Sequence, residues 1–167
     1  RIYNIIYNIN SMKRDNLDFI DLKILSKLQK NGRTTNVELA ESVDLSAPPC
    51  LRRVKALEEN GYIRGYHAEI DPIKLGFEVT VFAMVGLHNQ AESDLLSFEE
   101  RVGNLNYVRE CHMLNGEIDF ILKCVAPDLS SFQNFLTNEL TSAPNVASVK
   151  TSLTIRQSKY LPGVPVS

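Results

Sequence analysis

The residues best suited to chemistry in this chain are three cations, Arg52, Arg53 and Lys55, in the stretch SAPPCLRRVK. Guanidinium groups bind guanine edges in the major groove, and both guanidinium and ammonium groups bind phosphate oxygens. The sequence contains no Ser/His/Asp order, Walker glycine loop or GxGxxG motif, so catalysis has no support. The pattern therefore indicates contact with a nucleic acid rather than an enzyme active site.

A helix must hold these cations, and its ends are marked in the sequence. Ser46 is predicted to be the N-cap, because its hydroxyl can accept a hydrogen bond from an unpaired backbone N–H. Pro48 and Pro49 are tolerated in a first turn, and Gly61 supplies a left-handed C-cap. One apolar stripe should pack inward and leave the cations outside: Cys50 or Leu51, Val54 and Leu57.

Two further helical patterns precede this helix and complete a helix-turn-helix unit. The first runs over Leu17–Gln29 and is ended by Asn31-Gly32, and the second is capped by Thr35 or Asn36. In such a unit the third helix enters the major groove by its N-terminal end, here Ser46 to Arg53. An ordinary three-helix bundle with a solvated cationic face is the alternative interpretation.

The remainder of the chain changes to a strand-rich pattern. Alternation over Tyr62–Ile70 predicts a strand or short ribbon, and Asn115-Gly116 indicates a hairpin. The order βαββαβ predicts a ferredoxin-like four-stranded antiparallel sheet with both helices on one face, so the fold class is α+β. The expected strands are Phe77–Leu87, Tyr107–Leu114, Asp119–Val125 and Val146–Ile155, and the expected helices Ala91–Val102 and Leu129–Leu140.

Both faces of this sheet are predicted to be apolar. In the first strand Val81, Ala83 and Val85 share one face, whereas Phe82 and Met84 lie on the other. Two helices can cover only one face, and an uncovered apolar face is unusual for a monomer. We therefore expect a symmetric homodimer in which a second sheet covers it.

Charge distinguishes the two halves of the chain. Residues 12–66 carry ten Lys/Arg against eight Asp/Glu, whereas residues 67–167 carry seven against twelve. Only the first half is therefore expected to meet phosphate. The three cysteines form no CxxC pair, which fits a reducing cytoplasm, and no apolar run is long enough to span a bilayer.

The domain boundaries follow from these changes in pattern. We expect a mobile N-terminal extension, a winged-type helix-turn-helix domain, a ribbon or hinge linker, the ferredoxin-like domain and a C-terminal tail. Their respective bounds are 1–11, 12–62, 63–76, 77–160 and 161–167.

Three segments resemble one known family. SAPPCLRRVKALEENGYIRGY resembles the recognition helix and exit ribbon of the Lrp/AsnC (leucine-responsive, feast/famine) transcription factors. LDFIDLKILSKLQKNGRTTNVELAESVDLS is similar to their first two helices, and ECHMLNGEIDFILKCVAPDLSSF to their second domain. The resemblance covers Leu17 to Ile155. It implies a cytoplasmic, nucleoid-associated regulator that binds a pseudo-palindromic operator in double-stranded DNA. It also implies a homodimer that stacks into octamers and senses an amino acid, with leucine or methionine expected.

Pattern and resemblance together select the residues expected to contact DNA. Arg52 stands where relatives often carry an acidic or neutral residue, so their operator preference does not transfer to this chain. Arg33 matches a family arginine, although a simple surface cation is an alternative. The full set comprises Arg33, Thr35, Asn36, Ser46, Ala47, Pro48, Arg52, Arg53 and Lys55.

The resemblance also implies an effector site near the hairpin, at an interface between subunits or between dimers. Gly116 and Asp119 match a family Gly-x-x-Asp motif. A glycine turn exposes N–H groups to a ligand carboxylate, and an aspartate can accept a hydrogen bond from an ammonium. The alternative is an aspartate that only caps the turn. Ile118 replaces a frequent aromatic, so ligand identity does not transfer. The expected set is Leu114, Asn115, Gly116, Glu117, Ile118 and Asp119, with Thr151 and Ser152 from the last strand.

Two other functions remain open at this point. One is an architectural protein that wraps DNA with little sequence preference, and the other is an amino-acid sensor that does not bind DNA. Cys111 and His112 are adjacent, so they point to opposite sheet faces and do not form a metal-ligand pair. No metal or cofactor is expected.

Overall fold

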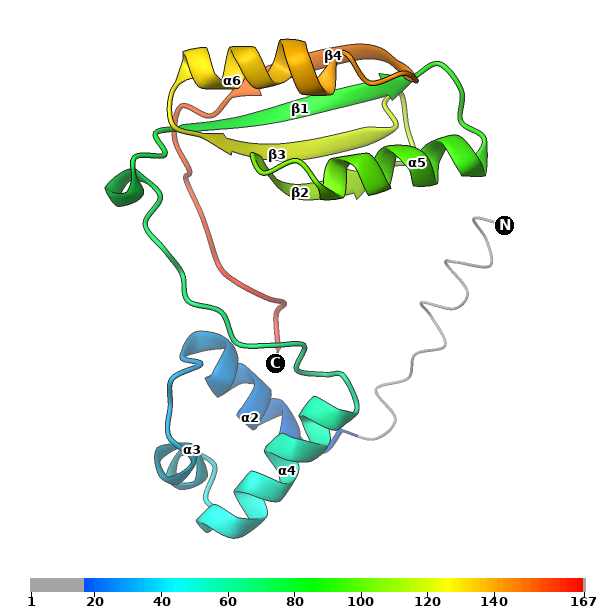
Figure 1. The fold of residues 1–167 in the computed structure, drawn as a ribbon. Helices are drawn as coiled ribbons and strands as arrows, with labels where there is room; N and C mark the ends of the chain where they lie inside the picture. The colour runs from blue at the N-terminus through cyan, green and yellow to red at the C-terminus, as the bar shows by residue number, and fades with distance from the viewer. Residues whose placement is uncertain (1–16, 167) are drawn as a thin grey trace. The chain divides into compact units, whose positions relative to one another are not determined.

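The computed structural model describes residues 17–166, so the predicted extension at residues 1–11 lies outside the described part. The chain forms two compact units. The first unit ends at Glu69 and also includes the segment from Tyr160 onward, and the second comprises Ile70–Lys159 (Figure 1). The chain therefore passes between the units twice. Within residues 17–166 no helix has the length and apolarity needed to cross a membrane.

In the described part of the first unit, the chain forms three helices: α2 (Phe19–Lys30), α3 (Asn36–Ser42) and α4 (Ala47–Glu59). Asp18 and Thr35 cap α2 and α3, and each cap is a reciprocal capping box with the third residue of its helix. The buried core residues come from all three helices and the turn between α3 and α4. They are Ile24, Leu39, Ala40, Val43, Cys50 and Leu57.

The start of α4 differs from the prediction. Ser46 is the N-cap residue, but its hydroxyl makes no capping hydrogen bond. The two N–H groups that a capping hydroxyl normally meets belong to the second and third helical residues. These are Pro48 and Pro49, which have no N–H. Gly61, by contrast, follows the helix with φ of 75°, as expected for a left-handed C-cap.

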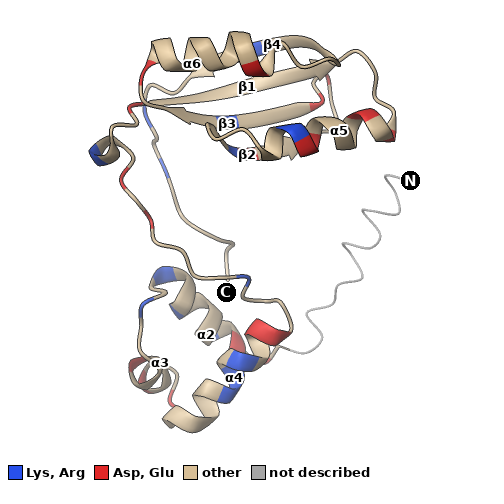
Figure 2. Cartoon of the chain, viewed as in Figure 1, with Lys and Arg blue, Asp and Glu red and all other residues tan. Residues whose placement is uncertain are grey.

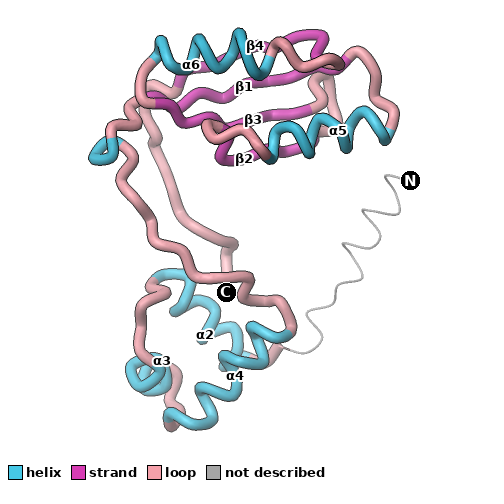
Figure 3. The backbone as a smooth tube through the Cα atoms, in the orientation of Figure 1, coloured by secondary structure: helices cyan, strands magenta, loops and turns pink. Residues whose placement is uncertain are grey.

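The predicted strand over Tyr62–Ile70 is wrong, because this segment has no regular secondary structure (Figure 3). A strand needs a neighbour to complete its hydrogen bonds, and the described sheet consists only of four later strands. Within this segment, Ile63 packs against the core of the three helices, whereas residues 64–70 are exposed. The hydroxyl of Tyr66 donates a hydrogen bond of 2.9 Å to Glu58, and burial together with this carboxylate raises the pKa of Tyr66 to about 12.

The second unit is the predicted ferredoxin-like α+β domain. The strands β1 (Val79–Leu87), β2 (Val108–Met113), β3 (Phe120–Ala126) and β4 (Val146–Leu153) pair antiparallel in the order β2-β3-β1-β4. Helix α5 (Glu92–Gly103) separates β1 from β2. Helix α6 (Leu129–Phe135), which continues into a π-helical turn, η2 (Leu136–Leu140), separates β3 from β4. A short 3₁₀ turn, η1 (Ile73–Leu75), precedes β1.

The two faces of the sheet differ in burial as the alternation predicts. One face packs against α5 and α6, and its residues Val81, Ala83, Val85, Phe120, Leu122 and Cys124 are buried. The opposite face, called here the open face, carries Phe82, Met84, Ile121 and Val125 on its two central strands. Phe82 is 38% exposed there. Lys123 of β3 also lies on the open face, directly opposite Phe82, and its ammonium lies 2.8 Å from the carboxylate of Glu110 on the edge strand β2.

The C-terminal segment returns to the first unit and contacts α2. The side-chain amide of Gln29 donates to the carbonyl of Val164 at 2.8 Å and accepts from its N–H at 3.0 Å. Gly163, next to it, has φ of 76°, and a Cβ at this position would overlap the Gln29 side chain. The residue type therefore fits both the backbone conformation and the close approach.

Candidate DNA-binding surface and effector loop

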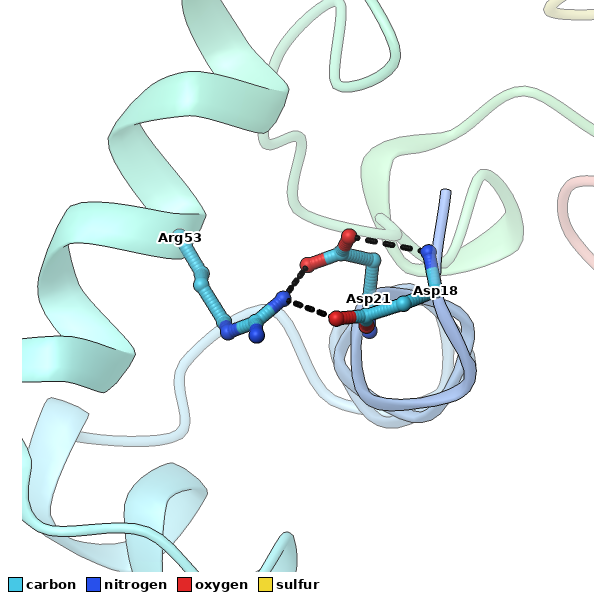
Figure 4. A network of polar contacts seen from close by, with 3 residues as sticks. All are labelled: Asp18, Asp21 and Arg53. Carbon is cyan, nitrogen blue, oxygen red and sulfur yellow. Dashed lines mark hydrogen bonds and ion pairs between the residues drawn. The ribbon is translucent and has the colours of Figure 1, made fainter. Parts of the chain in front are cut away.

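Arg53 joins α4 to the start of α2. Its Nη1 atom lies 2.7 Å from Oδ2 of Asp18 and 2.8 Å from Oδ1 of Asp21 (Figure 4). Two carboxylates thus hold its guanidinium within the domain, and these ion pairs link α4 to α2. The expected contact of Arg53 with DNA stays a prediction.

The two carboxylates lie in different surroundings. Asp18 is exposed, and its pKa is lowered from the ordinary 3.8, first by the hydrogen bond from the backbone N–H of Asp21 and further by Arg53. Asp21 is buried, with a relative exposure of 9%. A buried carboxylate needs a partner for its charge, and Arg53 supplies that partner.

The other two cations of α4 are not bound by the part of the chain that the structure describes. Arg52 and Lys55 are exposed and form no ion pair with any residue in the described range. Figure 2 shows the basic residues along α4, with acidic residues at its C-terminal end. Arg33 is also exposed, in the turn before α3. These three side chains remain available to phosphates or base edges.

Two residues that we expected to contact DNA form hydrogen bonds within the domain. The hydroxyl of Thr35 accepts from the N–H of Glu38 at 3.2 Å and donates to its carboxylate at 2.8 Å. The backbone N–H of Thr35, at 2.9 Å from this carboxylate, and then the hydroxyl lower the pKa of Glu38. The Asn36 amide donates to the carbonyl of Ala47 at 2.9 Å, and its oxygen is buried. Asn36 therefore links the start of α3 to the start of α4, and its contact with DNA stays a prediction.

The start of α4 presents a small, weakly polar surface. Ser46 and Pro48 are exposed and Ala47 is half-buried. The Ser46 hydroxyl is not used for capping, so it is free to meet a base edge or a phosphate.

One residue of the exposed helix face was missed. The apolar stripe allowed either Cys50 or Leu51 in the core, and the structure buries Cys50 completely while Leu51 stays 43% exposed. Positions 50, 54 and 57 follow the i, i+4, i+7 spacing of one face, and Leu51 lies one residue outside it. This spacing in the sequence was the signal that favoured Cys50 over Leu51 as the core residue.

Asp119 fastens the hairpin to β1. The β1–β3 ladder stops at the Val85–Phe120 pair, and Asp119 continues the contact beyond it. Its N–H donates to the carbonyl of Val85 at 3.0 Å, and its Oδ2 accepts from the N–H of Leu87 at 2.7 Å. The aspartate therefore has a structural role. Its other oxygen, Oδ1, has no partner among the described residues.

The hairpin loop comprises residues 115–118, because the N–H of Leu114 donates to the carbonyl of Asp119 at 2.8 Å. Gly116 is exposed, its φ is not positive, and a Cβ there would meet no atom within 4 Å. This chain alone therefore gives no steric reason for a glycine at 116. Open space remains for a ligand or a second subunit.

The structure does not bring Thr151 and Ser152 to this loop. Thr151 pairs with Ala83 and Ser152 with Phe82, so their side chains point to opposite faces of the sheet. Asp119 lies three residue rows and two strands from Thr151, which is roughly 14 Å at normal sheet spacings. Because Thr151 and Ser152 point to opposite faces, one subunit cannot place both of them against the same ligand.

Replacing Arg53 with alanine should destabilise the protein without removing an exposed cation. Asp21 would keep a buried charge without a partner, which costs about 1–3 kcal/mol in the free energy of unfolding. Arg52→Ala is the matched control, because the loss of this exposed neighbour should change that free energy by no more than about 0.5 kcal/mol. Urea unfolding of both variants measures the difference, and equal stabilities would contradict the assigned role of Arg53.

The loss of stability in Arg53→Ala should also depend on pH. Because the folded-state pKa of Asp18 lies below 3.8, its contribution is present above that pH and is lost as the pH falls through the folded value. The stability difference between the wild type and Arg53→Ala should therefore shrink in acid. A difference that grows below pH 3.8 would contradict this.

Each of the two units matches a known protein family. Residues 17–64 match a family model for a winged helix-turn-helix DNA-binding domain, and residues 80–164 match a model for the Lrp/AsnC ligand binding domain. The chain is 54% identical over 146 residues to a leucine-responsive regulatory protein of Rhizobium meliloti (strain 1021), covering 87% of this chain and 94% of that protein. It is 43% identical over 140 residues to a Bkd operon transcriptional regulator of Pseudomonas aeruginosa, covering 84% and 92% respectively.

A solved structure agrees with the fold. A transcriptional regulator of Neisseria meningitidis, in complex with L-Met, superposes with a TM-score of 0.86 at 36% identity and covers 90% of this chain and 97% of its own. The sequence matches and the fold agree across both units. The chain belongs to the Lrp/AsnC family of transcriptional regulators, with a winged helix-turn-helix DNA-binding domain followed by the family's ligand-binding domain.

Proposed function

We propose that this regulator binds a pseudo-palindromic operator through the exposed face of α4 and that leucine or methionine, bound near the Gly116–Asp119 loop, controls its binding. The observation that carries the first part is the division of cations on α4. Arg53 is held internally, whereas Arg52 and Lys55 are exposed and unpaired with described residues. A rigidly held helix with free cations on one side can enter a major groove and meet its phosphates.

The second part rests on the unused oxygen of Asp119. Oδ2 accepts the hydrogen bond from Leu87, so the carboxylate is held in place while Oδ1 stays free for a ligand ammonium. The open space over Gly116 gives a ligand carboxylate access to backbone N–H groups. One relative is named for its response to leucine and a solved neighbour contains L-Met, which supports an apolar amino acid as the effector.

The open face of the sheet supports assembly into a homodimer. We propose that such dimers associate further into an octamer. The central strands of the open face carry Phe82, Met84, Ile121 and Val125 opposite the helix-covered core. A second copy of the same face would remove these side chains from water in a symmetric interface. A neighbouring subunit is also the route by which Thr151 or Ser152 can approach a ligand at another chain's hairpin loop.

Substitution of the free cations should weaken DNA binding mainly through phosphate contacts. An operator is first selected from a random duplex library with the full chain, and gel shifts then measure affinity over a range of salt concentrations. Arg52→Ala or Lys55→Ala should lower the salt slope by about one for each phosphate that the replaced side chain neutralises. Lys74→Ala, a cation of η1 outside α4, is the control. If neither α4 variant changes affinity or slope, α4 is not the DNA-binding helix.

Removing only the charge of Asp119 should weaken effector binding and spare the fold. In Asp119→Asn the amide oxygen can still accept from Leu87, but it cannot form a charge-assisted bond to an ammonium. The affinity should fall by about tenfold or more. Calorimetry with leucine and methionine measures this, with Glu99→Gln on α5 as a control for the removal of one negative charge. Unchanged affinity at an unchanged melting temperature would remove Asp119 from the site.

A charge on the open face should dissociate the dimer. Phe82→Glu places a carboxylate where a second sheet would exclude water, so sedimentation should show a smaller species. Leu96→Glu on α5 replaces another exposed apolar residue, 58% exposed, and should leave the assembly intact. An unchanged mass for Phe82→Glu would mean that subunits meet elsewhere.

A further inference from the structure

The exposed face of α4 is not purely cationic. Pro48, Leu51, Arg52 and Lys55 follow the spacing i, i+3, i+4, i+7, so they form one stripe along the helix. Every member is exposed, and Leu51 is exposed by 43%. The inward face is occupied by Cys50, Val54 and Leu57, and Arg53 is bound to the carboxylates of α2.

A single exposed leucine is ordinary on a protein surface. Leu51 differs in its neighbours, because both free cations of α4 share its stripe and Pro48 lies one turn before it. Cations on such a surface match phosphates or the acceptor atoms of guanine. The apolar group that the major groove offers beside these acceptors is the C5-methyl of thymine. Charge and apolar surface on this face therefore match the same partner.

The backbone at the start of α4 points to base contacts as well. A helix usually begins with free N–H groups that bind anions such as phosphate. Here Pro48 and Pro49 have no N–H, and the N–H of Cys50 donates to the carbonyl of Ser46 at 3.3 Å. Only the N–H of Ala47 is left, so the end of the helix is a poor phosphate site. Its side chains remain to make the contacts.

We infer that Leu51, supported by Pro48, packs against a thymine C5-methyl in the major groove and thereby selects an A·T pair at that operator position. Arg52 and Lys55 hold the helix in the groove by charge, and Leu51 distinguishes thymine by apolar contact. This inference rests on the proposed DNA binding by α4. It adds a specificity-determining residue that carries no charge.

The test removes the methyl group from the DNA and the side chain from the protein. In the selected operator, each thymidine is replaced in turn by deoxyuridine, which pairs in the same way but lacks the C5-methyl. One such replacement should weaken wild-type binding by about fourfold, the value of one buried methyl-sized group. Leu51→Ala should bind the thymidine operator about as weakly and show no further decrease with deoxyuridine at that position.

Control variants separate this effect from a general decrease in binding. Leu51→Met keeps an apolar side chain, so its deoxyuridine penalty should remain. Lys55→Ala should bind more weakly and with a lower salt slope, yet keep the penalty, whereas Leu51→Ala should keep the wild-type slope. Because Leu51 is outside the core, its variants should keep the wild-type melting temperature, which thermal unfolding confirms for each preparation.

Four results would overturn the inference. If wild-type protein binds with unchanged affinity when deoxyuridine replaces any of the thymidines, it makes no contact with a thymine methyl group. A penalty that persists undiminished in Leu51→Ala assigns the contact to another residue. A salt slope lowered in Leu51→Ala would mean that the variant disturbs phosphate contacts instead. If the wild type shows no salt-dependent binding to any duplex, the proposed DNA binding fails, and this inference fails with it.

Discussion

The orientation of α4 depends on the ion pairs between Arg53 and the two aspartates at the start of α2. One guanidinium nitrogen contacts Asp18, which caps α2, and Asp21, which is buried. These contacts fix the rotation of α4 about its own axis, because Arg53 can reach the carboxylates only when its side of the helix faces α2. The same rotation turns Arg52 and Lys55 to solvent. The apolar packing of Cys50 and Leu57 and these ion pairs together determine which cations of α4 face solvent.

In the second unit, one carboxylate completes the structure through one oxygen, and its other oxygen is the one that the proposed effector site uses. Asp119 replaces the ladder where β1 and β3 stop pairing, and this use occupies only Oδ2. A side chain held in this way loses little freedom when a ligand arrives, so ordering it takes little from the binding free energy. The structural hydrogen bond and the unused oxygen both follow from the position of Asp119 immediately before β3.

Much of this architecture could be predicted from the sequence because apolar periodicity is a strong signal. The α2, α3 and α4 helices, the four strands and the βαββαβ order all follow from it. The error at Tyr62–Ile70 has a physical origin, since alternation gives a segment strand character but does not provide a pairing partner. The missing Ser46 cap was predictable, because the two prolines visible in the sequence lack the N–H groups it needs.

The candidate site was harder to predict because residue type does not specify a partner. Arg52 and Arg53 are chemically identical, and only their places on the helix decide that one is paired and the other free. The acidic pair Asp18 and Asp21, three residues apart at the start of a helix, was the signal for a bound arginine. For Thr151 and Ser152, strand alternation already placed the side chains on opposite faces.

The contact between Gln29 and Val164 has a consequence for how the protein is made. The first unit contains residues from α2 and from the segment after Tyr160, with the whole second unit between them in the chain. During synthesis the three helices leave the ribosome early, but the hydrogen bonds between Gln29 and Val164 can form only after Val164 has been translated. The helical domain is therefore completed only after the sheet domain has been translated.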